Sequence, residues 1–460
     1  MPIKINTSLT PKLLKPQIKH IFELSAPKLI SIENTWDPNN GAPVFTVNGK
    51  YSSCQWTEWT HGFQYGSLLL QYEVTGDDFF LKSAIDNILS RMTNYITHMG
   101  VHDHGFNIIS TFGNLRRIIL NKKLQQQESL LPVCELALKV SGAVQATRWT
   151  TIENNLGYIY SFNGPHSLFI DTIRTLRSLG MAHLLGHVLK CEHDSEVSLL
   201  ERLIKHLITT AKYSVFYGDN RDIYDFYGRV AHESIFNIND GKYRGPSTQQ
   251  GFSPYSTWMR GLAWAICGFA EELEFLDYLP ENVFPEKFTK KNVLDIIIKA
   301  NQATADFYLK NCCTCGIVYW DSHAPNLYRL GPDYLNQPAN PYNDWEPVDS
   351  SAAAIAAQGL FRLGNFLLKK SQTNLGQSYK QAALTIFSNL SNEPYLSTNP
   401  NHQGLLLHSV YHRPKGWDHI SEHQKIPNNE SSMWGDYHLR ELAILILSEA
   451  EEKPYPTFFV

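Results

Sequence analysis

The fold is decided by an uncharged stretch in the last quarter of the chain, Ser350-Ser351-Ala352-Ala353-Ala354-Ile355-Ala356-Ala357-Gln358-Gly359-Leu360. Small and apolar residues on every face of a helix predict that the helix is buried all round. The next segment, residues 369–387, is polar on one face and therefore predicts a covering helix. The same contrast separates the charge-poor residues 258–270 from the lysine-rich residues 286–307. This alternation of inner and outer helices predicts two concentric layers, an all-α (α/α)6 barrel.

Helical periodicity recurs along the 460 residues and predicts twelve helices. Their expected ranges are 10–25, 62–75, 77–98, 107–119, 127–141, 166–179, 194–216, 256–275, 287–311, 350–368, 374–391 and 433–452. Two polar stretches, Tyr217–Pro254 and Trp320–Val348, interrupt them, and loops of this length are usually functional. Six helical hairpins account for the whole length, so we expect residues 1–460 to form a single domain. An irregular α-solenoid is the alternative, but no repeat of fixed period is visible.

The charge and hydropathy patterns exclude several classes of partner. Lysine and arginine number 40 against 44 acidic residues, so the net charge is −4, whereas nucleic-acid-binding proteins usually carry a basic excess. The longest uncharged apolar run, Gly261–Ala270, is too short to cross a bilayer. Residues 1–14 lack the apolar core and cleavage site of a signal peptide. We therefore expect a cytoplasmic protein, or a periplasmic or secreted one if a leader has been trimmed.

Two aspartates are candidates for acid–base chemistry, because apolar or helical surroundings bury them without an obvious partner. Asp103 precedes a predicted inner helix, and Asp171 lies within another. Burial raises the pKa of a carboxyl group toward neutrality, which is what a general acid needs. Two carboxyl groups in different environments can then divide the acid and base roles. In the alternative interpretation, Asp103 caps its helix and Asp171 is a hydrogen-bonded core residue.

Other chemistries have less support in the sequence. His102 and His104, with Cys191 and His193, match no common zinc spacing, so we expect neither metal nor cofactor. The cluster Cys312-Cys313-Thr314-Cys315 could be a thiol or metal site, but no second cysteine pair faces it. Neither a Gly-rich phosphate loop nor a Gly-x-Ser-x-Gly elbow is present. Aromatic residues make up 12% of the chain and often adjoin polar ones, an arrangement that suits sugar rings, although aromatics also fill cores.

Several motifs resemble, in order, those of one known family. They are Trp59-Thr60-His61-Gly62-Phe63, Tyr72-Glu73-Val74-Thr75-Gly76-Asp77, His102-Asp103-His104-Gly105-Phe106, Ile170-Asp171, Ser256-Thr257-Trp258-Met259-Arg260-Gly261-Leu262-Ala263-Trp264-Ala265-Ile266, Asp349-Ser350-Ser351-Ala352 and Trp434-Gly435-Asp436-Tyr437. Each motif is weak alone, but their order across residues 59–437 is specific. The chain therefore resembles the unsaturated glucuronyl hydrolases, glycoside hydrolase family 88, which are related to family 105.

This resemblance implies an (α/α)6 barrel that removes a 4,5-unsaturated glucuronic acid from the non-reducing end of lyase-generated oligosaccharides. It implies that Asp171 protonates C4 of the enol ether and activates the water that adds at C5, after which the hemiketal opens. Asp103 is implied to position the substrate and to help keep Asp171 protonated. The residues implied to bind substrate are Trp59, His102, His232, Gln250, Trp258, Arg260 and Trp264. Among them, Arg260 and Gln250 are the donors suited to the substrate's carboxylate.

Departures from the family's pattern leave the details of the substrate open. His61 stands where the family commonly has aspartate, Gln249 where it has histidine, and Thr175 where it has asparagine. The parent polysaccharide, the linkage, any sulfate preference and the oligomeric state are therefore not predicted. Three alternatives remain: an unsaturated rhamnogalacturonyl hydrolase, an exo-β-glucuronidase acting on saturated sugars, and a non-catalytic sugar-binding toroid.

Overall fold

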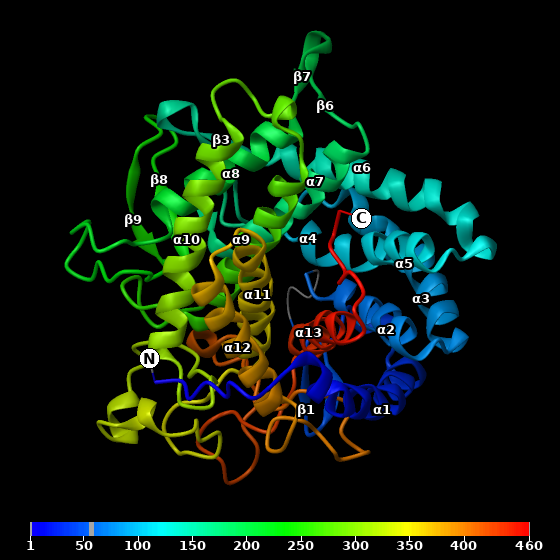
Figure 1. Ribbon diagram of the computed structural model, residues 1–460, viewed down its shortest axis with the longest axis vertical. Coiled ribbons are helices and arrows are strands. Elements are labelled where there is room, and N and C mark those ends of the chain that lie inside the picture. Colours follow the sequence, from blue (N-terminus) through cyan, green and yellow to red (C-terminus); the bar gives the residue numbers. More distant parts are fainter. Residues whose placement is uncertain (1, 55–58, 460) are drawn as a thin grey trace.

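The computed structural model describes residues 2–54 and 59–459, and its helices form two concentric layers (Figure 1). The inner layer consists of α2 (His61–Thr75), α4 (His104–Asn107) with α5 (Asn114–Lys122), α7 (Leu176–Leu184), α9 (Met259–Tyr278), α11 (Ser350–Lys369) and α13 (Met433–Ala450). The outer layer consists of α1 (Pro11–Thr35), α3 (Asp78–Arg91), α6 (Leu131–Thr147), α8 (Leu199–Tyr213), α10 (Lys290–Asn311) and α12 (Thr373–Leu390). Helix α13 packs against α2, and this contact closes the inner ring. The predicted all-α (α/α)6 barrel is confirmed.

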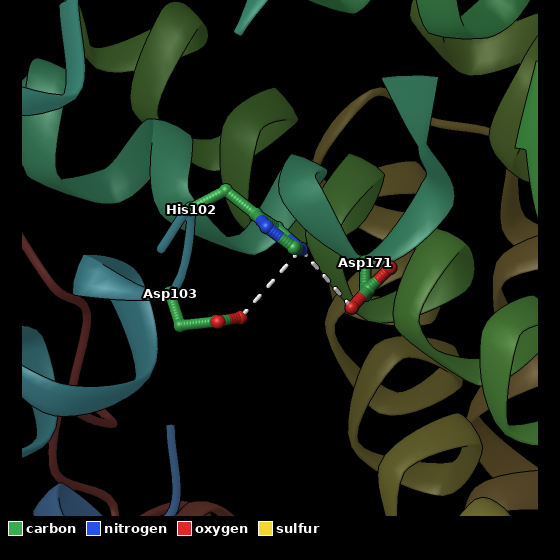
Figure 2. A group of neighbouring side chains, drawn as sticks. All are labelled: His102, Asp103 and Asp171. Carbon is green, nitrogen blue, oxygen red and sulfur yellow. Dashed lines mark ion pairs between the residues drawn. The ribbon is translucent and has the colours of Figure 1, made fainter. Parts of the chain in front are cut away.

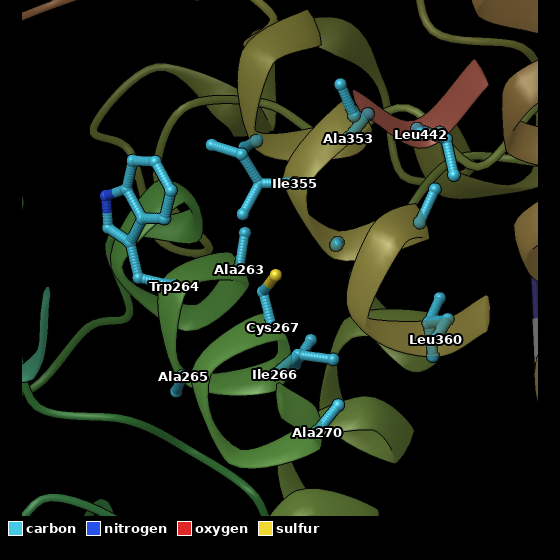
Figure 3. Close-up of a cluster of buried hydrophobic side chains, with 14 of the residues drawn as sticks. Ala263, Trp264, Ala265, Ile266, Cys267, Ala270, Ala353, Ile355, Leu360 and Leu442 are labelled. Carbon is cyan, nitrogen blue, oxygen red and sulfur yellow. The ribbon is translucent and has the colours of Figure 1, made fainter. Parts of the chain in front are cut away.

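The contact between α9 and α11 shows why the inner helices need small residues. Figure 3 shows Ala263 and Cys267 of α9 facing the helix that carries Ala353 and Ile355, and all four side chains are fully buried. A Cβ atom added to Gly359 would lie only 2.6 Å from the backbone nitrogen of Cys267. Larger side chains would therefore separate the two helices, because protein interiors are already close-packed. The uncharged stretch that predicted the fold is the surface along which the inner helices touch.

The outer helices bury one face only. Helix α8 is typical, because its leucines and isoleucines face the core while the Ser198 side chain accepts a hydrogen bond from the Glu201 N–H at its start. The α2–α3 hairpin turns at Gly76, whose left-handed φ of 68° ends α2. Asp77 then caps α3 by accepting from the Phe79 N–H. In the described residues, no helix combines the length and the apolar character that a bilayer crossing requires.

Tertiary structure changes two of the predicted helices near the site. The segment expected as one helix over 166–179 begins as strand β5 (Ser167–Phe169), continues as a 3-10 helix η6 (Ile170–Thr175) and only then becomes α7. Strand β5 pairs with β8 (Glu233–Phe236), which in turn pairs with β9 (Tyr243–Ser247). The helix expected over 107–119 is interrupted by a π-turn, η3 (Ile109–Gly113). The sequence predicts that Asp171 lies inside an α-helix, but the structure places it at the start of a 3-10 turn.

The remaining strands are short and lie in connections between helices. They are β1 (Phe45–Val47), β2 (Lys50–Ser52), β3 (Trp149–Thr151), β4 (Gly157–Ile159), β6 (Leu189–Lys190) and β7 (Glu196–Val197), paired as three antiparallel hairpins. Besides the two long connections that the sequence indicated, the structure has a third, residues 391–432 between α12 and α13. This connection supplies part of the site.

Candidate active site

A pocket of about 390 Å³ opens where the amino ends of the inner helices meet. Eight of the nine predicted site residues line it: Trp59, His102, Asp103, Asp171, Gln250, Trp258, Arg260 and Trp264. Trp59 precedes α2, Asp103 precedes α4, Asp171 lies in the first turn of η6, and Trp258 is the N-cap residue of α9. The alternation of inner and outer helices brings these separate motifs together, because every inner helix then runs in the same direction. Helix amino ends carry partial positive charge, which favours an anionic ligand.

Three of these residues form a compact cluster of charged groups (Figure 2). His102 Nε2 lies 3.5 Å from Asp171 Oδ2 and 3.7 Å from Asp103 Oδ1, so the imidazole is placed between the two carboxylates. The histidine ring stacks on Phe162 and meets the edge of Phe169. Only 2% of the His102 side chain is exposed, against 12% for Asp171. The histidine is thus buried more deeply than either aspartate, although all three residues line the pocket.

The electrostatics of this cluster correct one expectation. Burial alone would raise the pKa of Asp171, but the contact with the His102 cation, with a smaller effect from His232, holds the pKa of Asp171 below its usual value. Conversely, burial would lower the pKa of His102, but the charges of Asp103 and Asp171 raise it. The prediction of a raised pKa for Asp171 is therefore wrong for the free protein. Its physical reason is the neighbouring imidazolium, which favours the ionised carboxylate.

The capping role considered for Asp103 does not fit the structure. Asp103 occupies the N-cap position of α4, but its side chain makes no capping hydrogen bond to that helix. Its carboxylate instead lies beside His102. The next histidine, His104, is turned away from the pocket, with Nδ1 at 2.9 Å from Ser141 Oγ and Nε2 at 2.8 Å from the His98 carbonyl oxygen.

The side chains of Gln145 and Thr175 hold in place the segment that carries His102 and Asp103. Gln145 Nε2 donates to the Val101 carbonyl oxygen at 3.0 Å, and Thr175 Oγ1 accepts from the Gly105 N–H at 3.1 Å. The Thr175 hydroxyl donates in turn to Gln145 Oε1 at 3.1 Å. Since Thr175 ends η6, the same hydroxyl connects the loop to the element that carries Asp171.

The amino end of α4 is pressed directly against η6. A Cβ atom added to Gly105 would lie 1.9 Å from the carbonyl oxygen of Arg174, so only glycine fits. Arg177 Nη2 donates to the Gly105 carbonyl oxygen at 2.7 Å, and both arginines pair with Glu271 of α9. The adjacent Glu272 is fully buried, and neither of its carboxyl oxygens has a hydrogen-bond partner among the described residues. Burial, with the neighbouring Glu271 charge, holds the pKa of Glu272 well above its usual value.

His232 is the predicted site residue that stands behind the pocket wall. Its ring packs against Phe169 and Trp258, with ring centroids 4.6 and 4.8 Å away. The Gln249 N–H donates to His232 Nδ1 at 2.9 Å. Burial lowers the pKa of His232 to about 4, so the imidazole is neutral at ordinary pH. Its placement supports a part in orienting the Gln249–Gln250 backbone.

Arg260 is almost entirely engaged in internal contacts. It is 1% exposed, and it pairs with Asp349 at 3.2 Å. Its Nη2 donates to Gln250 Oε1 at 2.9 Å and to the Tyr411 carbonyl oxygen at 2.7 Å, and its Nη1 donates to the Val410 carbonyl oxygen. Arg260 thus ties the 391–432 connection to the amino ends of α9 and α11. Its role in binding the substrate's carboxylate stays a prediction.

Aromatic rings form most of the pocket wall, and several of them were not predicted. Trp59 packs on Trp434 with ring centroids 4.8 Å apart and donates its indole N–H to the Tyr411 hydroxyl at 3.1 Å. Further lining residues are Phe106, Phe162, Phe169, His412, Lys415 and Trp417. The run Tyr411-His412-Arg413-Pro414-Lys415-Gly416-Trp417 carried a usable signal, because aromatic and basic residues stand there beside proline and glycine in a stretch without helical periodicity.

The described residues contain one group that could offer three metal ligands, namely His102, Asp103 and Asp171. Their nearest donor atoms lie within 4.8 Å of one another. The two carboxylates favour the protonated imidazole, which has no lone pair to give to a metal. The Cys312 and Cys313 thiols are buried, and burial raises the pKa of Cys312 to about 12, so it is not a thiolate. That the protein works without metal or cofactor stays a prediction.

The closed helical barrel, the aromatic pocket and the paired carboxylates are features of a carbohydrate-processing protein of the (α/α)6 class. No protein-family model matches the chain. It is 24% identical to an unsaturated chondroitin disaccharide hydrolase of Streptococcus agalactiae, over 98% of each chain, and 23% identical to an unsaturated glucuronyl hydrolase of Bacillus sp. strain GL1, over 86% of this chain and 87% of that one. The solved structure of the unsaturated glucuronyl hydrolase of S. agalactiae superposes with a TM-score of 0.69 at 21% identity, covering 100% of this chain and 99% of that one. The predicted resemblance is confirmed: the chain is similar to unsaturated glucuronyl hydrolases in sequence and in fold along most of its length.

Proposed function

We propose that the chain is an unsaturated β-glucuronyl hydrolase, which removes a 4,5-unsaturated glucuronic acid from the non-reducing end of oligosaccharides that a polysaccharide lyase has made. The proposal goes beyond the similarity to known enzymes, because it assigns a reaction to particular side chains of this chain. Asp171 is the general acid and general base of the reaction. Asp103 and His102 orient the Asp171 carboxyl group and set its protonation state, and the aromatic pocket binds the sugar.

The observation that carries the proposal is the shared histidine of the two carboxylates. Ordinary glycosidases place two carboxyl groups on either side of the scissile bond, roughly 6.5–9.5 Å apart in inverting enzymes and about 5–5.5 Å apart in retaining ones. The distance between the carboxyl groups therefore does not distinguish the present site, whereas the shared histidine does. Here both carboxylates reach the same imidazole nitrogen, and their nearest oxygens lie within 4.8 Å. Such an arrangement suits the passage of a proton to and from one carboxylate, which is what hydration of a double bond requires.

The mechanism follows from Asp171, the more exposed of the two carboxylates that line the pocket. Protonated Asp171 delivers its proton to C4 of the enol ether, and the positive charge that develops at C5 is attacked by water. The Asp171 carboxylate accepts a proton from that water, so the group returns to its initial state. The product is a hemiketal, which opens and releases the remaining sugar without further catalysis. The aromatic wall keeps other water from the alkene carbon.

Binding of an anionic sugar ring is supported by the composition of the wall. Trp59, Trp258 and Trp264 offer flat apolar faces, and the amino ends of the inner helices supply partial positive charge for a carboxylate. The relative from S. agalactiae is named for an unsaturated chondroitin disaccharide, and a variant of the S. agalactiae unsaturated glucuronyl hydrolase has been solved in complex with dGlcA-GalNAc6S. A lyase-generated chondroitin disaccharide is therefore the first substrate to test.

The test follows the alkene and the two atoms added to it. Turnover of the disaccharide should abolish the ultraviolet absorbance of the conjugated double bond. In oxygen-18 water the label should enter at C5 of the released keto acid, and in heavy water deuterium should enter at C4. Label at the anomeric carbon, or efficient cleavage of the saturated glucuronide, would establish an ordinary glucuronidase instead. Binding of the disaccharide without any turnover would establish a sugar-binding toroid, and selective turnover of unsaturated rhamnogalacturonan fragments would establish the related hydrolase.

A further inference from the structure

His102 differs in its bonding from three neighbouring buried histidines, His104, His206 and His232. His232 Nδ1 accepts the Gln249 N–H, and His206 Nδ1 accepts the Ile159 N–H at 3.0 Å, so both rings are fixed as neutral tautomers. His104 is held by Ser141 and the His98 carbonyl. Neither ring nitrogen of His102 has a hydrogen-bond partner among the described residues, and its Nε2 faces only the two carboxylates. Backbone groups therefore do not fix the protonation state of His102.

We propose that His102 is the resident proton carrier of the site: its Nε2 holds the catalytic proton in the free protein and exchanges it with Asp171 Oδ2 during each turnover. This inference rests on the proposed function, because it explains how a carboxylate can act as the acid. His102 is the group that can hold the proton while the pocket is empty, and the distance of 3.5 Å closes to a hydrogen bond with a small shift of either side chain.

The charges around the histidine agree with this role. Asp103, before α4, and Asp171, on η6, lie beside it as anions. Arg148, at the end of α6, is a cation that opposes protonation, while His206 on α8 and His232 before β8 are neutral. The two adjacent carboxylates outweigh the more distant arginine, since the pKa of His102 is raised despite complete burial. The Phe162 and Phe169 rings contact the remaining faces.

Entry of the substrate supplies the reason for the proton to move. The carboxylate of the sugar adds a negative charge beside Asp171 and displaces water from it, and both effects favour the protonated carboxyl group. The proton then passes from His102 Nε2 to Asp171 Oδ2, and from Oδ2 to C4 as the new C–H bond forms. Water adds its oxygen to C5 and gives one proton to Asp171, which returns it to His102. One water molecule is consumed, and the cluster regains its starting state.

The first test compares His102→Gln with His206→Asn across the pH range, using the chondroitin disaccharide. Glutamine cannot carry a proton, so Asp171 must hold it alone, and an ordinary aspartate is protonated in about one molecule per thousand at pH 7. We expect kcat/KM of His102→Gln to fall about a hundredfold at pH 7 and to recover progressively toward pH 5. His206→Asn, whose amide oxygen can replace Nδ1, should keep the wild-type profile. A loss of activity in His102→Gln that is equal at every pH, or no loss, would overturn the proposal.

The second test does not depend on activity. Nitrogen-15 spectra of histidine-labelled free protein should contain a buried imidazolium at pH 7 that disappears in His102→Gln. In Asp103→Asn and Asp171→Asn the same imidazolium should lose its proton at a lower pH. A neutral His102 in a wild-type protein that cleaves the disaccharide would refute the proton carrier and leave the proposed function standing. A charged His102 in a protein that leaves every unsaturated disaccharide intact would refute the proposed function, and the carrier role with it.

Discussion

Replacement of Thr175 by valine should damage catalysis without touching a group that contacts the substrate. Valine has nearly the shape of threonine, so the packing at the end of η6 is preserved. The substitution removes the acceptor of the Gly105 N–H and the donor to Gln145 Oε1, both of which are buried. The segment with His102 and Asp103 then loses the hydrogen bond that joins it to the element with Asp171.

The magnitude follows from the two groups left without partners. Each buried unsatisfied polar group costs about 1–3 kcal/mol, so the variant should be destabilised by roughly 2–6 kcal/mol. Unfolding entropy of about 2.1 cal/mol/K per residue corresponds to roughly 1 kcal/mol per degree for a chain of 460 residues, so Tm should fall by about 2–6 °C. Displacement of a catalytic group by up to 1 Å lowers the rate by as much as about a hundredfold, and we expect kcat to fall by roughly 10- to 100-fold.

The assay is the loss of alkene absorbance at saturating disaccharide, with Tm measured by circular dichroism on the same preparations. Thr175→Ser is the matched control, because it keeps the hydroxyl and loses only a methyl group, and it should retain most of kcat. Wild-type kcat in Thr175→Val would refute the reasoning, since the hydroxyl would then not position the loop. Equal loss of kcat in Thr175→Ser would also refute it, by showing that packing and not hydrogen bonding matters there.

Three further variants test other parts of the site and its support. Asp171→Asn should abolish turnover while binding of the disaccharide, measured by calorimetry, stays within about tenfold, because the amide keeps the shape but cannot donate a proton to C4; near-normal kcat would contradict the assignment. Arg260→Lys should raise KM more than it lowers kcat. It should also lower Tm, because lysine cannot replace the contacts to Asp349 and to the Val410 and Tyr411 carbonyls. A lower Tm with unchanged kinetics would make Arg260 purely structural. Wild-type stability should decline as pH rises above the ordinary glutamate pKa near 4.5, because folded Glu272 keeps a proton that the unfolded chain releases. Glu272→Gln removes this decline of stability with pH, so its Tm relative to wild type should rise by roughly 1 °C per pH unit as the pH increases above 5. A constant difference in Tm would contradict the raised pKa of folded Glu272.

The helical barrel was predictable because its layers differ in composition. Residues 350–360 contain no charge, and α11 packs on both α9 and α13 inside the ring. Where prediction failed, a distant partner decided the local conformation. Residues 167–169 belong to the helix predicted over 166–179, but they pair with residues 233–235 as a strand. No local pattern indicates that pairing, because the two segments are about 65 residues apart.

The residues of the site were predictable from the family that the ordered motifs resemble, but the charge state of the site was not. Motifs before α2, α4, η6 and α9 meet because the hairpins place their amino ends together. The pKa of Asp171, however, depends on His102, which is 69 positions earlier in the chain. Burial was the correct first cause and favoured a raised pKa, and the single neighbouring imidazolium reversed its sign.

A motif predicts which side chain stands at a position, but not which of its hydrogen bonds are already occupied. The family resemblance implies that Arg260 binds the substrate's carboxylate, but in the free protein Asp349, Gln250 and two backbone carbonyls already accept hydrogen bonds from its guanidinium group. A bound carboxylate must therefore replace one of these acceptors or rely on other groups of the wall. Replacement would release Gln250 or loosen residues 410–411 of the long connection between α12 and α13, so binding of the acid group would be linked to the packing of that connection. This linkage is the physical reason that Arg260→Lys should alter both KM and Tm. Substitution of a positively charged residue that lies only at the surface of the pocket would alter KM and leave Tm unchanged.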